Sequence, residues 1–181
     1  IVHRHVKSCS LIKDLPKKIA IHINDTHPTM AIPEFMRILL DDCGFGWDEA
    51  WDVCTKVFAY TNHTVMSEAL ECWPEDLVQR LLPRIYQIIK EIDNRHRAKV
   101  WESTSDADMV ERTAVISNGV VRMANLCVSS CHSVNGVSAL HSDILKKTIF
   151  SDFYALEPDK FKNVTNGIAY RRWLSQANPA L

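Results

Sequence analysis

The chain has 181 residues, of which 46% are hydrophobic and 24% are charged, with only 5 Gly and 7 Pro. This composition indicates a globular protein and excludes disordered, collagen-like and low-complexity classes. Lys and Arg number 21 against 22 Asp and Glu, so no broad basic field is available for nucleic acid or an anionic membrane. No apolar stretch approaches the roughly 18 to 20 residues that cross a bilayer. We expect a cytoplasmic protein with no nucleic-acid and no membrane partner.

The cysteines predict reduced thiols. They do not form the short, dense framework of a small secreted domain, and several lie in apolar helical patterns. Cys127 and Cys131 are four positions apart, which is not the spacing of a zinc knuckle. We therefore expect neither a disulfide framework nor structural zinc. The sequence starts at Ile1 without Met, which suggests an internal piece of a longer chain.

The first half of the sequence alternates short apolar runs with amphipathic segments. Residues 18–23 predict a buried strand that ends at a polar turn, residues 24–28. Residues 30–40 have a helical period, and Gly44 supplies a stop signal. The pattern then repeats: residues 47–57 predict a helix, and residues 57–61 predict a strand that ends at Asn62-His63-Thr64.

The second half continues this alternation. Residues 77–92 mark one face of a long helix, with Pro83 as a break or kink. Residues 103–108 predict a surface link, and Asn118-Gly119 predicts a turn. Residues 120–128 fit either a helix or a strand, residues 137–145 fit a helix, and residues 161–165 fit a strand. The whole pattern predicts an α/β fold with a largely parallel sheet.

Polar side chains follow several predicted strands. His27, His63 and His132 each follow an apolar run, and they are accompanied by a carboxylate and several amides: Asp25, Asn24, Asn62, Asn135 and Asn166. The carboxyl ends of parallel strands meet at one edge of a sheet, where ligands collect. Neutral donors and acceptors with one carboxylate suit a ligand rich in hydroxyl groups. The pattern therefore predicts a carbohydrate site.

Structural explanations exist for the same residues. Asp25 can cap the helix that follows, with His27 bonded to backbone, and His63 can be a satisfied loop residue. Asn135-Gly136 and Asn166-Gly167 can be turns that require positive φ.

Other functional classes also remain open. Asp25, His27, His63 and His132 include ligand types for a divalent ion, as in a metal-dependent hydrolase, although no His-Glu-x-x-His pair occurs. A nucleophilic scheme with Cys131 beside His132 is disfavoured because adjacent side chains do not usually face each other. A pure interaction module is the third class.

Four long motifs then narrow the choice: KIAIHINDTHPTMAIPEFMRILL, VFAYTNHTVMSEALECWPEDL, CHSVNGVSALHSDILKKTIFSDF and LEPDKFKNVTNGIAYRRWL. In this order, over about residues 18–181, they closely resemble the α-glucan (glycogen, starch or maltodextrin) phosphorylases. The resemblance implies an α/β segment of a two-lobed GT-B type glycosyltransferase with largely parallel sheets and helices. Such enzymes use inorganic phosphate to remove glucose 1-phosphate from α-1,4-glucan with retention.

The resemblance also implies roles for individual residues. Asp25 and His27 resemble the pair that lines the sugar cleft. His63 resembles the catalytic-site residue that contacts the 6-hydroxyl and whose carbonyl supports the cationic transition state. The other matches are Asn166 as a second 6-hydroxyl partner, Asn135-Gly136-Val137 as the wall near the sugar, and Trp173 as a cofactor-side contact. His132 receives no definite role.

The resemblance further implies what lies outside the chain. Residues 1–165 resemble the end of the N-terminal lobe, and residues 166–181 resemble the start of the C-terminal, cofactor-side lobe. The family uses pyridoxal 5'-phosphate, whose attachment lysine lies outside this chain, and the parent is expected to be a homodimer. We therefore expect the isolated 181-residue chain to be inactive. Ser130-Cys131 and Ala169-Tyr170 depart from the usual Gly-Ser and Thr-Pro, which affects turns more than chemistry.

Overall fold

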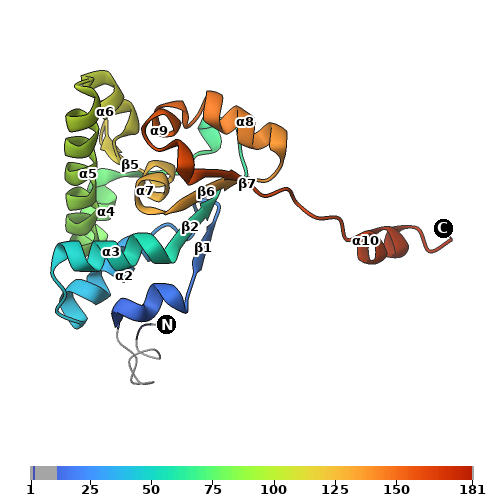
Figure 1. Cartoon of the computed structure of the whole chain (residues 1–181), viewed down its shortest axis with the longest axis horizontal. Coiled ribbons are helices and arrows are strands. Elements are labelled where there is room, and N and C mark those ends of the chain that lie inside the picture. Colours follow the sequence, from blue (N-terminus) through green and yellow to red (C-terminus); the bar gives the residue numbers. More distant parts are fainter. Residues whose placement is uncertain (1, 3–11, 181) are drawn as a thin grey trace.

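A four-stranded parallel sheet forms the centre of the protein (Figure 1). The computed structural model describes residue 2 and residues 12–180. The strands have the order β1-β2-β6-β7 and are β1 Ile21–Asn24, β2 Phe58–Thr61, β6 Ser133–Gly136 and β7 Phe161–Asn163. Each neighbouring pair is parallel, with Asn24 beside Thr61 and Thr61 beside Asn135. The predicted α/β class and parallel sheet are confirmed, and all four carboxyl ends lie at one edge.

Helical segments precede and connect these strands. They are η1 Ile12–Lys17, α2 Ala31–Arg37, η2 Ile38–Asp42, α3 Trp47–Val57, α7 Met123–Ser130, α8 Ala139–Lys147, α9 Ser151–Leu156 and η4 Pro158–Lys160. The helix predicted over residues 30–40 is present, but its last part winds as a π-helix, η2. The following Gly44 has φ +71°, a conformation that glycine adopts without a Cβ clash.

A long excursion separates β2 from its neighbour β6. It contains η3 Ser67–Ala69, β3 Cys72–Pro74, α4 Glu75–Leu81, α5 Pro83–Thr104, α6 Ala107–Thr113, β4 Ile116–Ser117 and β5 Val120–Arg122. Pro83 starts α5, as the predicted break indicates. Asn118 and Gly119 have φ values of 51° and 72° and form the tight turn between β4 and β5, which pair with β3 in a small antiparallel sheet.

The core lies between the parallel sheet and its helices. Phe58 and Tyr60 on β2 are fully buried. Phe35 of α2 packs edge-on against Phe58, with ring centroids 5.4 Å apart, and Phe150 meets Tyr60 at 6.5 Å. Burying side chains of this size contributes about 1.5 to 3 kcal/mol each. Phe58 and Tyr60 are two positions apart on β2 and share one face of the strand, which these contacts anchor in the core.

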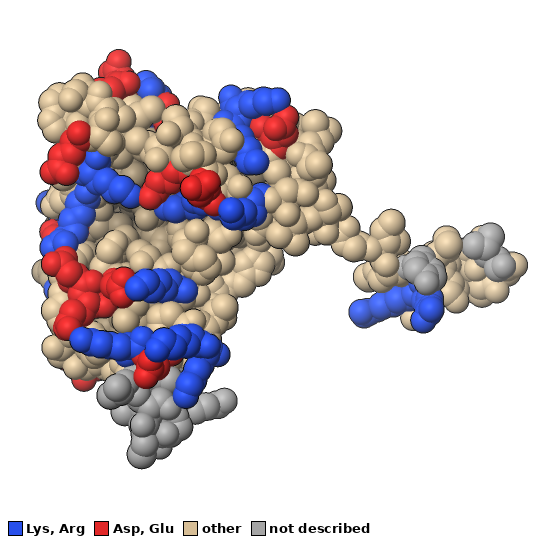
Figure 2. Space-filling model, viewed as in Figure 1, with Lys and Arg blue, Asp and Glu red and all other residues tan. Residues whose placement is uncertain are grey.

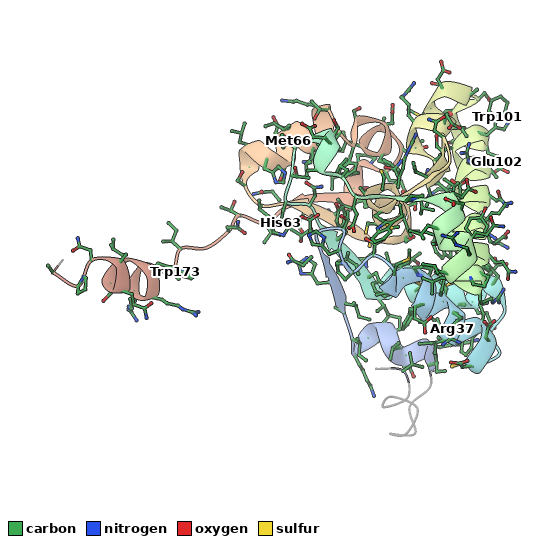
Figure 3. The ribbon with its side chains drawn as sticks, turned by 180° about the vertical axis from the view of Figure 1, so that it is seen from behind. Arg37, His63, Met66, Trp101, Glu102 and Trp173 are labelled. Atoms are coloured by element: carbon green, nitrogen blue, oxygen red, sulfur yellow. The ribbon has the colours of Figure 1, made fainter. Side chains whose placement is uncertain are left out.

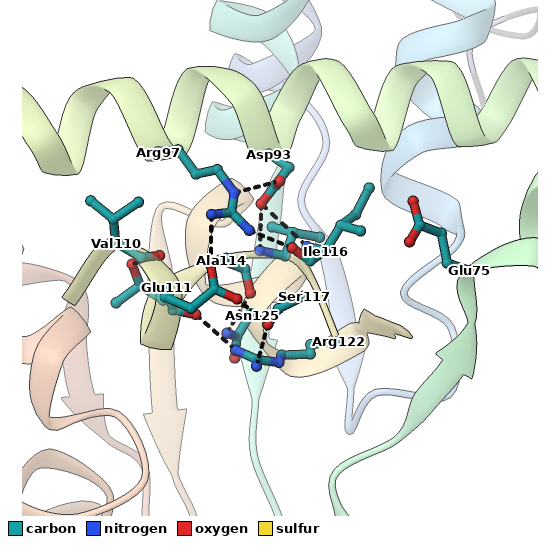
Figure 4. A network of polar contacts seen from close by, with 12 residues as sticks. Glu75, Asp93, Arg97, Val110, Glu111, Ala114, Ile116, Ser117, Arg122 and Asn125 are labelled. Carbon is teal, nitrogen blue, oxygen red and sulfur yellow. Dashed lines mark hydrogen bonds and ion pairs between the residues drawn. The ribbon is translucent and has the colours of Figure 1, made fainter. Parts of the chain in front are cut away.

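A polar network fastens α5 to the small sheet (Figure 4). The buried Asp93 carboxylate accepts from the backbone N–H of Val115 at 2.7 Å and of Ile116 at 3.2 Å. Arg97 Nε donates to Asp93 Oδ2 at 2.8 Å, and its Nη1 donates to Glu111 Oε2 at 2.9 Å. The hydrogen bonds of this cluster offset the cost of taking the Asp93 carboxylate out of water.

The end of the described chain leaves the body of the protein. After β7 the chain is extended, and α10 Tyr170–Ala177 lies away from the sheet at the end of this arm (Figures 1 and 3). Ile168 in the arm is 86% exposed, an unusual setting for a large apolar side chain. We call residues 164–180 the arm.

The surface carries both signs of charge. Figure 2 shows one face, where basic and acidic side chains lie interleaved. Lys99, for example, pairs with Glu157 at 2.6 Å. Within residues 12–180, no helix is long and apolar enough to cross a membrane. The five cysteines in the described part are free thiols, as predicted, and Cys9 lies outside it.

Candidate functional site

The carboxyl edge of the parallel sheet carries most of the residues that the sequence singles out. His63 Nε2 lies 2.7 Å from Asn24 Oδ1, so the end of β1 and the loop after β2 are in contact. Thr61 Oγ1 donates to Asn135 Oδ1 at 2.7 Å, which joins the ends of β2 and β6. Asp25 N donates to the carbonyl of Thr61 at 2.9 Å. Figure 3 places His63 at the end of the sheet from which the arm departs.

Asn62 gives the loop after β2 its shape. It is fully buried, and its Nδ2 donates to the hydroxyl of Tyr60 at 3.0 Å. Its Oδ1 accepts from Thr64 N at 2.9 Å, while its own N–H donates to the carbonyl of Asn135 at 3.0 Å. The adjacent His63 is exposed. A fixed, buried neighbour therefore presents His63 to solvent.

The turn after β1 is strained at Asp25, which has φ +60°. Its Oδ1 accepts from Thr26 N at 2.7 Å. The helix-cap explanation for Asp25 is wrong, because the N-cap of α2 is Met30, and in the described structure Met30 makes no side-chain cap bond. The carboxylate instead stabilises the local turn.

Glu71 is a residue that the sequence analysis missed. Its Oε2 lies 3.5 Å from Nδ1 of His27 and accepts from the hydroxyl of Thr26 at 3.1 Å. Its Oε1 accepts from the indole N–H of Trp73 at 3.2 Å. Glu71 thus links the turn after β1 to β3. His27 lies beside this carboxylate, whereas the structural explanation expected it to be hydrogen-bonded to a backbone group. No spacing signal marks Glu71, because Thr26 is 45 positions away.

An apolar pocket of about 190 Å³ opens beside this turn. His27, Glu71 and Trp73 line its polar side, and Met30 and Leu81 are among the apolar residues that complete it. The indole of Trp73 and the imidazole of His27 offer flat surfaces beside directional polar groups. Such a combination is common where proteins bind small polar molecules.

The wall at the end of β6 is built by close backbone approach. Gly136 and Gly167 both lack positive φ in the described chain, so the prediction that these turns need it is wrong. A Cβ at Gly136 would instead lie 2.6 Å from Ser142 Oγ. Val137 O accepts from Asn166 N at 3.0 Å, which brings Asn166 to the same edge.

Two predicted residues lie elsewhere. His132 precedes β6 and so lies at the amino edge of the sheet, where its N–H donates to Phe58 O and its Nδ1 is 3.2 Å from Thr55 O. The expectation that it follows a strand is wrong, because most of the apolar run before it folds as α7. Trp173 is 64% exposed on α10 in the arm, where it stacks with Arg172, and Figure 3 shows it apart from His63.

The rival chemistries lose support from this arrangement. Among the described residues, no group of three His, Cys, Asp or Glu side chains is placed to hold a metal ion. The proposed ligand His132 lies at the opposite edge from Asp25 and His63, so the metal-dependent hydrolase is not supported. Burial raises the pKa of the Cys131 thiol well above its ordinary value, which opposes a role as nucleophile.

A parallel sheet whose carboxyl edge gathers polar side chains defines an α/β protein with its candidate ligand site at that edge. Residues 1–181 match the carbohydrate phosphorylase family. The chain therefore belongs to this family.

Similar proteins carry consistent names. The chain is 50% identical over 182 residues to the glycogen phosphorylase of Bacillus subtilis, covering 100% of this chain and 23% of that protein. It is 53% identical to cytosolic alpha-glucan phosphorylase 2 of Arabidopsis thaliana (93% and 21%) and 55% identical to the muscle glycogen phosphorylase of Mus musculus (92% and 20%). The chain thus spans about a fifth of the length of these relatives.

Proposed function

We propose that this chain is a segment of an α-glucan phosphorylase, a retaining glycosyltransferase that converts α-1,4-glucan and inorganic phosphate to glucose 1-phosphate. The observation that carries the proposal is the contact of His63 with Asn24 beside Asp25 and Asn135 at one sheet edge. These groups form directional hydrogen bonds with little net charge, which suits sugar hydroxyls. Names of relatives 50% to 55% identical to the chain support the same reading.

The hydrogen bonds suggest how His63 acts. Asn24 Oδ1 can only accept, so His63 donates from Nε2, and in the neutral ring Nδ1 is then the acceptor. We assign that nitrogen to the 6-hydroxyl of the reacting glucose, with Asn166 as the second partner. Asp25 and His27 line the cleft, and Asn135-Gly136-Val137 form the wall. The carbonyl of His63 stabilises the positive charge that develops on the sugar.

The cofactor belongs to the same proposal. When bound in the complete protein, pyridoxal 5'-phosphate would supply a phosphate group able to exchange protons with the substrate phosphate. Trp173 is assigned to the cofactor side because its exposed indole has apolar surface that the described body leaves uncovered. The attachment lysine is assigned to the part of the complete protein outside these residues.

The arm supports the proposed division of the chain. Residues 1–165 form the end of the N-terminal lobe, and residues 166–181 start the C-terminal lobe. Ile168 is 86% exposed and Trp173 64% exposed, as expected for side chains that pack against another lobe. A cytoplasmic location agrees with the cytosolic relative from Arabidopsis thaliana. The homodimer expected of the complete protein stays a prediction.

A chimera tests the proposal. Residues 1–181 replace the matched segment of the Bacillus subtilis glycogen phosphorylase, and the product is assayed with maltodextrin and phosphate after exhaustive chelation. We expect glucose 1-phosphate at a rate within about tenfold of the parent enzyme, treated identically as control. A folded chimera that is inactive, or that loses its activity when metal ions are removed by chelation, would contradict the proposal. The isolated chain should form no product and no reducible lysine adduct with pyridoxal phosphate.

A further inference from the structure

One histidine outside the predicted site connects two of its loops. His141 lies in the first turn of α8 and is partly buried. Its Nδ1 is 3.1 Å from the backbone N of Val137, the last residue of the wall. Its Nε2 is 3.4 Å from the carbonyl oxygen of Thr64, the residue after His63. The imidazole therefore bridges the end of β6 and the loop after β2.

The two backbone partners determine the protonation of this ring. The N–H of Val137 can only donate, so Nδ1 of His141 accepts and carries no proton. The ring proton then lies on Nε2 and points to the carbonyl of Thr64, which can only accept. The bridge requires this one neutral tautomer, because a second proton would place two N–H groups against each other at Val137.

The position of His141 is itself fixed by the start of α8. The Ser138 hydroxyl caps the helix by accepting from His141 N at 3.1 Å. Ser142 packs against the backbone of Gly136, and its hydroxyl donates to Asn163 Oδ1 at 2.9 Å. The helix start is thereby attached to both β6 and β7. A displacement of the Thr64 loop must break the bond to a ring that cannot follow it.

We propose that His141 is a positioning residue that sets the separation of His63 from the Asn135-Gly136-Val137 wall, and thereby the preference for a donor with a 6-hydroxyl. The proposal rests on the proposed function, in which His63 contacts that hydroxyl. His141 acts through the carbonyl of Thr64, one peptide from His63, and touches no reacting atom. Loss of the bond frees the loop and weakens the 6-hydroxyl contact more than the remaining sugar contacts.

Two matched substitutions in the chimera separate the two bonds. His141→Asn retains an acceptor near the place of Nδ1 but is too short to reach Thr64. His141→Gln places an amide donor near the place of Nε2, within reach of Thr64, and offers no acceptor at the place of Nδ1. His132→Asn, at the opposite edge of the sheet, is the control. Thermal unfolding confirms that each variant is folded.

The readout is the ratio of kcat/KM for glucose 1-phosphate to that for 6-deoxyglucose 1-phosphate, measured in glucan synthesis. We expect His141→Asn to lower this ratio about tenfold, while His141→Gln and His132→Asn keep it within about threefold. His141→Asn should lower it no further once His63 is Ala. An equal loss with both donors, an unchanged ratio, or an additive effect on His63→Ala overturns the proposal. An inactive chimera before any substitution would instead count against the proposed function.

Discussion

Gly136 and Ser142 are in closer contact than any side chain at position 136 would permit. A Cβ at Gly136 would lie 2.6 Å from Ser142 Oγ and 2.9 Å from its N and Cα. Two of these three neighbours are backbone atoms, which cannot rotate away. The end of β6 therefore packs directly against α8, within the Asn135-Gly136-Val137 wall.

Gly136→Ala should destabilise the protein by about 1 to 3 kcal/mol, because β6 and α8 must separate to admit the methyl group. Chemical denaturation of the 181-residue chain measures the change. Gly167→Ala is the control, since a Cβ at Gly167 would meet no described atom within 4 Å, and it should change stability by less than about 0.5 kcal/mol. Equal effects of the two substitutions would contradict the close-contact explanation.

His63→Ala in the chimera should raise the activation free energy by about 2 to 4 kcal/mol, which is roughly one to three decades in rate. The hydrogen bond to the 6-hydroxyl is lost where charge develops. Donors without that hydroxyl should lose their disadvantage, measured by the two kcat/KM values. Asn24→Ala should give a smaller loss of the same kind, because Asn24 only orients the ring. Unchanged discrimination in His63→Ala would mean that the residue is structural.

Glu71→Ala should lower kcat/KM of the chimera about tenfold, since His27, Thr26 and Trp73 lose their common partner. Glu71→Gln retains an acceptor but no charge, and an intermediate loss is expected. The exposed Glu68 on the same loop provides the control substitution Glu68→Ala. If Glu71 acts by holding His27, the double variant with His27→Ala should resemble His27→Ala alone. Full additivity would exclude this coupling.

Asp93→Ala should destabilise the protein by about 3 to 5 kcal/mol, because it leaves Arg97 and two backbone N–H groups without their buried carboxylate. Glu91→Ala, which removes the exposed partner of Arg95, should cost less than about 1 kcal/mol. Urea denaturation of both variants gives the comparison. Similar losses would show that the network in Figure 4 contributes no more than a surface ion pair.

His96 should make stability depend on pH. Its ring stacks on Phe153, and burial lowers its pKa from 6.5 to about 4. As the pH falls, the unfolded chain takes up a proton near 6.5, whereas the folded chain does so only near 4. The contribution of His96 to the free energy of unfolding is thus fully present above about pH 6.5, and up to about 3 kcal/mol of it is lost as the pH approaches 4. The urea midpoint of His96→Phe should lack this dependence on pH between about 6.5 and 4. Parallel pH profiles of the variant and the unchanged protein would contradict the role of His96.

Local patterns in the sequence are enough to predict β1, β2 and β7, but not β6, because Ser133–Gly136 is a short run with polar residues that reads as a turn. β1 and β2 are short, mostly apolar runs that end in polar turns. Pro83, predicted as a break or kink in one long helix, separates α4 from α5. The run from Val120 to Val128 was ambiguous, because an unbroken apolar stretch has no period that separates strand from helix. It contains β5 followed by α7, which is why His132 was misplaced. β3 contains Pro74 and lies at a sheet edge, so it gave no strand signal.

The candidate site is predictable where its residues come just after predicted strands, as Asp25 after β1 and His63 after β2 do, whereas Asn135 lies within β6. Glu71 and His141 are not predictable, because their contacts join positions far apart in the sequence. His141 meets Thr64 from 77 positions away. Such contacts depend on how the loops are arranged in the folded protein. A single sequence has no local period or turn signal that predicts this arrangement.

The excursion between β2 and β6 has a consequence for how the protein folds. Thr61 and Asn135 are neighbours in the sheet although 74 positions separate them in the chain. Closing so long a loop has an entropic cost that grows with its length, whereas the β4–β5 hairpin and the contact of α4 with α5 are local. We expect these local units to form first and the pairing of β6 with β2 to come late. Until then β2 has an open hydrogen-bonding edge, and this edge is where a newly synthesised chain is most exposed to aggregation.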